Sequence, residues 1–285
     1  MAPAQIPAVR TPCVCTQARL FRIEGGTYAS FSRTDYSAFR EPRGQKLREW
    51  GARHSNGLLW EAARTTMHLV QLAPPPQREV PLRFAGRAPV EKNWMPLVWR
   101  DPDAGSELLF FVYSFCRAGF RVLRCNPTEG TCHLAHSLPP PSICTPTPGF
   151  CRPPTRSCHD YVKGGSQLIR VVWSDWPRST ADQSAAKHAV RSHEGYLGVV
   201  HRSRFSSYQH AFVALEPQPP FRVVASTDWF SLPHLNDSWT DPQLCAGLAL
   251  DNHRNLLLSY GVADCEALRV ALTLSDVEKH LIWVS

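Results

Sequence analysis

The stretch at 244–273, LCAGLALDNHRNLLLSYGVADCEALRVALT, carries most of the information about the fold. It contains three short apolar runs of strand length, at 244–250, 256–262 and 265–272. The segments 251–255 and 263–264 separate these runs, and both contain Asp or Asn, which close tight turns between antiparallel strands. The stretch therefore predicts a three-stranded antiparallel meander.

Both faces of this predicted meander are apolar, because the runs show little alternation between apolar and polar residues. We therefore expect other sheets to cover it on both sides. Ser259, Tyr260, Asp264 and Glu266 lie near the strand ends, where a buried core has no need of polar groups. A buried meander with polar residues at its rim is typical of one blade of a β-propeller.

Three similar units precede this stretch. They span 19–85, 91–137 and 163–230, and each contains about four predicted strands. The last unit spans 244–285, with a helical turn at 276–279 and its fourth strand at 280–285. Repetition of a four-stranded unit indicates a β-propeller. The alternative is a β-sandwich, which needs Greek-key crossings and polar outer faces that this pattern disfavours.

The repeats predict an all-β chain with one propeller domain of four-stranded antiparallel blades at 16–285. The preceding segment, 1–15, is rich in Pro and Ala, and we expect it to be disordered. The segment 138–160 is rich in Pro and Cys, cannot continue a sheet, and is expected to form a surface loop.

Charge and composition argue against several classes of partner. The net charge of +7 comes from arginines scattered along the chain, whereas a nucleic-acid-binding surface concentrates its charge on one face. No apolar run is long enough to span a membrane. The N-terminal residues lack the pattern of a secretory signal, and the sequence leaves the compartment and the oligomeric state open.

The ten cysteines include no Cys-x-x-Cys pair, so we expect neither a structural metal site nor a cofactor. Five of them fall between 125 and 158, and export from the cytosol would allow disulfides within that segment.

Several short elements occur in one order along the chain: EKNWMP at 91–96, GGS at 164–166, VHR at 200–202 followed by Tyr208 and His210, and CAGL and SYGVADCEA within 245–267. Together they resemble a group of five-bladed β-propeller domains that are found alone or fused to glycosyltransferase modules. This group is similar to the propeller glycoside hydrolases and phosphorylases that act on β-mannosides. The element at 91–94 also resembles one in fungal β-mannosyltransferases. The resemblance covers 16–285 and implies a carbohydrate-active domain with a glycan or nucleotide-sugar ligand.

The sequence departs from this family pattern in two places. The mannoside-acting families carry an Asp before Pro-Arg at the head of an early blade, as the proton donor. The matching stretch here is TQAR at 16–19, and Gln17 cannot donate a proton in that way. The family also implies five blades, whereas four units are visible and the residues before Arg19 cannot build another. We expect a chain truncated at its N-terminus rather than a ring that closes with four blades.

Candidate site residues lie at the heads of the units, because the first strand of each propeller blade lines the central channel. The heads are at 17–19, 91–94, 164–167 and 243–245. Glu91, Lys92 and Asn93 offer an acceptor, a cation and an amide beside the indole of Trp94, a set that suits a sugar. Alternatively, Glu91 and Lys92 pair with charges at the rim and Trp94 belongs to the core.

A second candidate group lies on two adjacent strands of the third unit. His201, Arg202 and His210 are expected to converge there, with Tyr208 facing the same way, and to bind phosphate or another anion. The alternative is that the histidines pack as hydrogen-bonded core residues.

The third candidate group is Tyr260 with Asp264 and Glu266, at the turn between the last two strands of the opening stretch. Two carboxylates can divide acid and base work at a glycosidic centre. We assign Glu91 and Asp264 as the catalytic carboxylates of glycosyl transfer or glycoside cleavage on mannoside-like glycans. The substitution at Gln17 favours the alternative of a non-catalytic glycan-binding or protein-interaction propeller.

Overall fold

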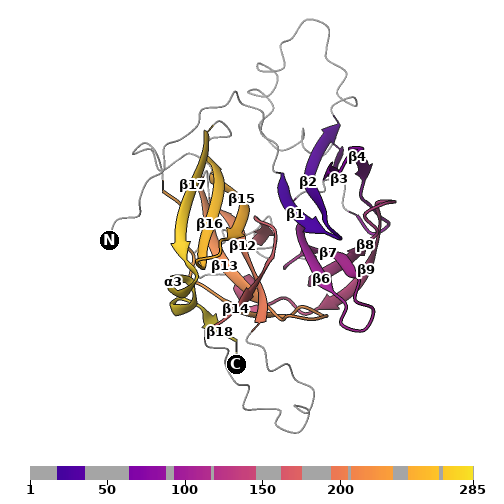
Figure 1. Cartoon of the computed structure of the whole chain (residues 1–285). Coiled ribbons are helices and arrows are strands. Elements are labelled where there is room, and N and C mark those ends of the chain that lie inside the picture. The colour runs from indigo at the N-terminus through magenta and orange to yellow at the C-terminus, as the bar shows by residue number, and fades with distance from the viewer. Residues whose placement is uncertain are drawn as a thin grey trace, which may run out of the picture.

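The computed structural model describes residues 18–35, 64–87, 93–116, 119–145, 162–174, 194–204, 207–233, 243–262 and 266–284. These residues form four small β-sheets arranged around a common centre, as in a propeller (Figure 1). The predicted all-β propeller fold is therefore confirmed. None of the helices in these ranges is long and apolar enough to cross a membrane.

The first two blades are formed by the N-terminal half of the chain. The first blade contains β1 (Arg19–Ile23), β2 (Gly26–Asp35), β3 (Arg64–Ala73) and β4 (Arg78–Pro81), all antiparallel. The second contains β6 (Met95–Arg100), β7 (Glu107–Ser114), β8 (Phe120–Cys125) and β9 (Thr131–Leu138), and the short strand β5 (Arg83–Phe84) adds to it parallel to β9.

The other two blades follow. The third contains β10 (Val162–Gly164), β11 (Ile169–Val172), β12 (Glu194–Arg204), β13 (Ser207–Leu215), β14 (Val223–Ser226) and β18 (Ile282–Trp283). The fourth contains β15 (Gln243–Leu250), β16 (Asn255–Val262) and β17 (Glu266–Thr273). The helical elements within the described ranges are η1 (Ser142–Cys144) and α3 (Leu274–Lys279), and α3 contains the predicted helical turn.

The turn between β15 and β16 shows why Asp and Asn are needed there. Asp251 Oδ1 accepts hydrogen bonds from the backbone N–H groups of His253 and Asn255, each at 2.8 Å. The side chain of Asn255 donates to the other carboxylate oxygen, at 2.9 Å. These bonds lower the pKa of Asp251, and the bond from the Asn255 side chain has the largest effect. The predicted turn is confirmed, and its residues hold β15 and β16 in register.

Two strands belong to other blades than the sequence predicted. The C-terminal strand β18 pairs with β14 of the third blade, so the fourth blade has three strands and not four. The apolar run at 80–85 also divides: its first part ends β4, and β5 crosses to the second blade. The length and apolarity of a run predict that it forms a strand. The strand with which it pairs depends on the path of the preceding loop.

Three clusters of buried apolar side chains seal the interfaces between successive blades. Met67 and Leu69 pack with Phe111 between the first and second blades. Met95 and Leu97 pack with Val200 between the second and third. Val199 and Phe212 pack with Leu258 between the third and fourth. Full burial stabilises a protein by about 1.5–3 kcal/mol for each such side chain, so these interfaces hold the blades together.

The fourth blade buries only one of its faces among the described residues. Along β17, half-buried and exposed positions alternate strictly, and Leu258, Tyr260 and Val262 of β16 all face the third blade. No comparable apolar cluster among the described ranges lies between the fourth blade and the first, which meet through their innermost strands β15 and β1. Within the part of the chain that the structure describes, the opening stretch is therefore covered on one side and not on both, as had been predicted.

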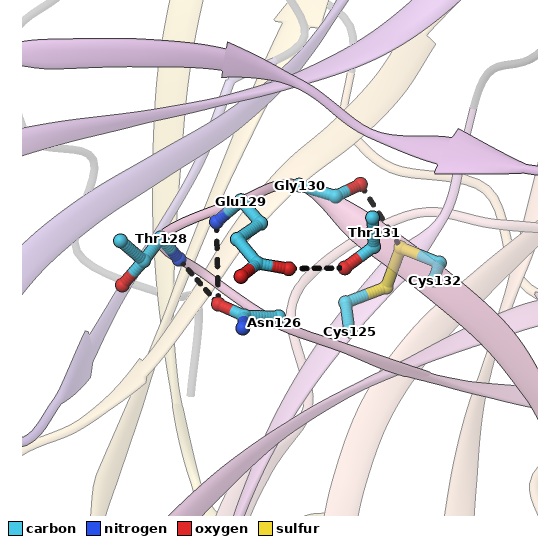
Figure 2. The surroundings of a disulfide bond; sticks show 7 residues. All are labelled: Cys125, Asn126, Thr128, Glu129, Gly130, Thr131 and Cys132. Atoms are coloured by element: carbon cyan, nitrogen blue, oxygen red, sulfur yellow. Dashed lines mark hydrogen bonds between the residues drawn. A yellow bond between two sulfur atoms is a disulfide. The ribbon is translucent and has the colours of Figure 1, made fainter.

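Two disulfides brace the second blade. Cys125 and Cys132 are directly opposite each other on β8 and β9, and Figure 2 shows the turn that joins these strands. In that turn, Asn126 Oδ1 accepts from the backbone N–H groups of Thr128 and Glu129, at 2.8 and 3.2 Å. The second disulfide, Cys116–Cys144, ties η1 to the end of β7, and both of its residues are buried. A disulfide within 125–158 was expected for an exported chain; the pairing of Cys144 with Cys116 was not.

Candidate functional site

The heads of all four blades meet around the side chain of Arg19. We call the residues that meet there the axial cluster: Arg19 at the start of β1, Asn93 just before β6, Gly164 and Gly165 at the end of β10, and Cys245 in β15. Arg19 Nε donates to the carbonyl oxygen of Gly165 at 2.7 Å. Its Nη2 donates to Asn93 Oδ1 and to the carbonyl oxygen of Gly164, each at 3.4 Å. A single guanidinium therefore joins the first three blades.

Arg19 is completely buried, and burial lowers its pKa to about 10. It therefore remains charged at neutral pH and supplies a fixed positive charge at the centre of the molecule. Burial also raises the pKa of the neighbouring Cys245 thiol to about 12, against the opposing effect of Arg19. Cys245 is consequently a neutral thiol at neutral pH and a poor nucleophile.

The backbone around the axial cluster is closely packed and locally strained. Asn93 has a φ of 65°, a left-handed conformation that Asn tolerates better than most residues. A Cβ atom at Gly164 would clash with the Asn93 carbonyl oxygen, so only glycine fits where the second and third blades touch. This close approach brings Asn93 within reach of Arg19.

Gln167 links the third blade to the fourth beside the axial cluster. Its side-chain amide donates to the carbonyl oxygen of Leu248 and accepts from the Leu248 backbone N–H, the latter at 3.3 Å. The side chain thus completes the hydrogen bonding of β15 as a neighbouring strand would. This contact holds the β15 head, including Cys245, against the third blade.

The histidines of the third blade form a second group, the histidine cluster, made of His201, Tyr208, His210 and Phe230. His201 and His210 are direct partners on β12 and β13, with ring centroids 6.4 Å apart. The ring of Tyr208 lies 5.2 Å from that of His201, and the ring of Phe230 lies 6.1 Å from that of His210. Both histidines are on the face of the third blade that packs against the fourth, because they continue the alternation of Val199 and Phe212.

His210 is fully buried, and neither of its ring nitrogens forms a hydrogen bond to the described residues. Burial is the main cause that lowers its pKa, to about 4, and the nearby backbone of Gln243 opposes this effect. The imidazole is therefore uncharged at neutral pH. His210 lies beside Gln243, and Gln243 is two residues from Cys245 in β15. The histidine cluster is therefore close to the axial cluster.

This burial predicts a defined pH dependence of stability. An unfolded histidine binds its proton near pH 6.5, whereas folded His210 binds it only near pH 4. The unfolded state therefore binds more protons between these values. The contribution of His210 to stability is complete above pH 6.5 and falls by about 3 kcal/mol as the pH drops to 4.

Urea unfolding of the wild type and of His210→Leu at intervals from pH 7.5 to 4.5 measures this effect. The free energy of unfolding should fall more steeply with acid in the wild type than in the variant. Parallel curves for the two proteins would show that the folded pKa of His210 is close to its ordinary value.

The structure separates some of the residues that the sequence analysis grouped together. Arg202 lies on the opposite face of the third blade from the histidines, where it donates to Gln209 Oε1 at 2.9 Å and its guanidinium lies 4.3 Å from the centre of the Trp229 ring. The predicted convergence of Arg202 with the histidines is thus not observed. Neighbouring residues on a strand point to opposite faces, so His201 and Arg202 cannot both face one site.

Trp94 and Tyr260, two of the predicted binding residues, make contacts within the protein. Trp94 is 1% exposed and packs edge-to-face against Phe111 and Tyr113, so in this structure its indole lies in the core and not at a surface that could hold a sugar. The Tyr260 hydroxyl donates to the Pro233 carbonyl oxygen at 3.1 Å. Tyr260 therefore anchors the segment that follows the third blade. Glu91, Lys92 and Asp264 lie outside the described residues.

Sequence reasoning undervalued Arg19 and Cys245. Both were recognised as parts of blade heads, but neither was proposed as a site residue. The available signal was their position at the start of a unit, which in a propeller directs a side chain to the axis. Among the described residues, no group of three or more His, Cys, Asp or Glu side chains is arranged to hold a metal ion.

Solved structures that are similar to this chain include propellers of carbohydrate-active proteins. A β-1,2-mannobiose phosphorylase from Listeria innocua, solved in complex with β-1,2-mannobiose, matches with a TM-score of 0.52 and 15% identity, over 92% of this chain and 59% of the phosphorylase. A protein from Bacteroides ovatus assigned to the glycoside hydrolases matches with a TM-score of 0.51 and 13% identity, over 92% of this chain and 69% of the hydrolase.

These similarities establish the fold alone, because the sequence identities are low. The chain spans less than two thirds of the length of the mannobiose phosphorylase. No family model matches the chain, and no curated protein matches it. Any activity must therefore be argued from the site.

Proposed function

We propose that this chain is a carbohydrate-active propeller that binds a β-mannoside-like glycan at the heads of its blades and acts in glycosyl transfer or glycoside cleavage. The observation that carries the proposal is the convergence of Arg19, Asn93, Gly165 and Cys245, one from each blade, at a single point. Elements that meet on one axis from four directions can surround a ligand with polar groups. Sugars require such directional hydrogen bonding.

The two proposed catalytic carboxylates are close in sequence to this point. Glu91 precedes Asn93 of the axial cluster by two residues. Asp264 follows Val262 by two residues, and Val262 pairs with Gln243 at the start of β15. One carboxylate with a raised pKa could protonate the leaving oxygen while the other, ionised, acts as a base or nucleophile.

Lys92 and Asn93 are the residues we propose for holding sugar hydroxyls, together with Tyr208 of the histidine cluster. His201 and His210 are buried as Trp94 is, which favours supporting roles for these two histidines. The fixed charge of Arg19 favours electron-rich groups at the axis, such as a carboxylate or a sugar oxygen. The similar phosphorylase from Listeria innocua binds β-1,2-mannobiose, which makes this disaccharide the first ligand to test. The core contacts of Trp94 and Tyr260 favour supporting roles for these two residues.

The second candidate function is glycan binding without catalysis. It is favoured by Gln17, which stands where the mannoside-acting families carry their proton-donating Asp. A propeller that keeps its sugar-binding heads and loses the acid would still recognise the glycan.

Incubation of the purified chain with β-1,2-mannobiose, with and without inorganic phosphate, distinguishes these functions. Hydrolysis releases two mannose molecules, and phosphorolysis releases mannose and mannose 1-phosphate. Cellobiose serves as the matched control, because it is a β-linked disaccharide of glucose. We expect turnover or binding of mannobiose and neither for cellobiose. Binding without turnover favours the binding module, and the absence of both refutes the proposal.

A further inference from the structure

A separate group of polar side chains lies on the first blade, away from the axial and histidine clusters. Thr66 and His68 alternate along β3 with Met67 and Leu69, which face the second blade. Thr66 and His68 therefore point to the opposite face. Glu79 reaches the same group from the adjacent strand β4. Neither the proposed glycan site nor the core uses these three residues.

The contacts within this group are those of a nucleophile, a base and an orienting carboxylate. Thr66 Oγ1 lies 2.9 Å from His68 Nε2, and His68 Nδ1 lies 2.8 Å from Glu79 Oε1. The second contact is at ion-pair distance but lacks the direction of a hydrogen bond. Such contacts are often loose in catalytic sites that hold no substrate.

The surroundings of His68 favour a neutral imidazole. The Phe31 ring stacks on the imidazole with centroids 5.7 Å apart, and the His68 side chain is 12% exposed. Burial is the main cause that lowers the pKa of His68, with Arg33 adding to it and Glu79 opposing it, so the ring can accept a proton at neutral pH. Arg33 is the cross-strand partner of Thr66, so the two side chains leave the sheet of the first blade on the same face. Its guanidinium lies 3.4 Å from Glu79 Oε1.

We propose that Thr66, His68 and Glu79 form a second, hydrolytic centre that cleaves esters of short carboxylic acids, with Thr66 as the nucleophile. Thr66 Oγ1 forms a bond to the acyl carbon as its proton passes to His68 Nε2. The bond from the acyl carbon to the alcohol oxygen then breaks, and the alcohol leaves with the proton from Nε2. Water attacks the acyl-Thr66 ester and gives a proton to Nε2, which returns it to Thr66 Oγ1 as the carboxylic acid is released.

Glu79 is a positioning residue in this scheme. It holds the imidazole with Nε2 toward Thr66 and stabilises the imidazolium that forms during each step. Thr66 and His68 are half-buried beside Phe31, so the smallest common acyl group, acetyl, is the first to test. This centre is independent of the glycan proposal, because it lies on other strands and uses none of the same residues.

Hydrolysis of p-nitrophenyl acetate by the full chain tests the proposal. Thr66→Val removes the hydroxyl at nearly constant volume and is expected to lower the catalysed rate by about 100-fold or more. Thr66→Ser should retain activity, and Glu79→Gln should lower the rate and shift its pH profile. Thr65→Val is the matched control, because Thr65 is the preceding residue of the same strand and points to the other face.

Mass spectrometry of the protein during turnover should locate the acetyl group on the peptide that contains Thr66, in the wild type and in Thr65→Val but not in Thr66→Val. The proposal is overturned if Thr66→Val hydrolyses the ester at the wild-type rate, if the acetyl group is found on another residue, or if the wild type gives no rate above that of buffer.

Discussion

Replacement of Arg19 by Met is expected to lower the free energy of unfolding by about 3–5 kcal/mol. The guanidinium donates three hydrogen bonds to oxygens of Asn93, Gly164 and Gly165 at a position that is completely buried. Hydrogen bonds from charged donors contribute about 1.5–3 kcal/mol each, and a buried acceptor left without a donor costs about 1–3 kcal/mol. Arg19→Lys should recover only part of this loss, because an ammonium lacks the planar fork that reaches several acceptors.

The matched control is Arg22→Met, which replaces an exposed arginine in the same strand. Surface substitutions of this kind change stability by about 0.5 kcal/mol or less. Urea unfolding of the three variants and the wild type measures the difference. Equal stabilities for Arg19→Met and Arg22→Met would mean that the axial cluster does not hold the blade heads together.

The largest effects on activity are expected for the two proposed catalytic carboxylates. If the chain turns over a β-mannoside, Glu91→Gln and Asp264→Asn should each lower the turnover rate by about 10²–10⁴-fold, the usual contribution of a positioned acid or base. Both substitutions remove ionisation while nearly preserving shape, so mannobiose affinity should change far less than turnover.

Rates of mannose or mannose 1-phosphate release, measured with affinity for each variant, separate chemistry from binding. Glu129→Gln is a suitable control, because Glu129 is an exposed carboxylate in the turn between β8 and β9, remote from the blade heads. Full turnover by both Glu91→Gln and Asp264→Asn would show that the catalytic assignment is wrong.

Local patterns in the sequence predicted most of the strands and the place where the blades meet. The Asp251 turn and the strands that flank it follow from residue types within a few positions of one another. The repeat of four-stranded units predicted that the heads at 17–19, 91–94, 164–167 and 243–245 would share one axis. The contacts of Arg19 with Asn93, Gly164 and Gly165 confirm this convergence for the described residues.

Long-range pairing was not predictable from the same patterns. Residues 282–283 form a strand as expected, but helix α3 and the turn after it carry that strand past the fourth blade to β14 of the third. The exposed face of β17 was also missed. Its exposed positions are Ala267, Arg269, Ala271 and Thr273, and the two alanines among them kept the apolar run from revealing which face meets water.

Predictions at the level of single side chains failed where the orientation of a strand decides the outcome. Arg202 is adjacent to His201 in sequence, but the alternation of the strand sends it to the opposite face, against Trp229. Trp94 follows Asn93 directly, yet only Asn93 reaches the axis while the indole enters the core. A one-residue uncertainty in strand register is enough to exchange a binding role for a packing role.

Titration calorimetry of β-1,2-mannobiose against the wild type, Asn93→Ala and Asn126→Ala tests whether the axial cluster binds a glycan. Asn93 belongs to the axial cluster, whereas Asn126 lies in the turn between β8 and β9. We expect the disaccharide to bind the wild type and Asn126→Ala equally, and Asn93→Ala at least about tenfold more weakly, a loss of about 1.4 kcal/mol. Absence of binding to the wild type, or equal affinity for all three proteins, would contradict a glycan site at the heads of the blades.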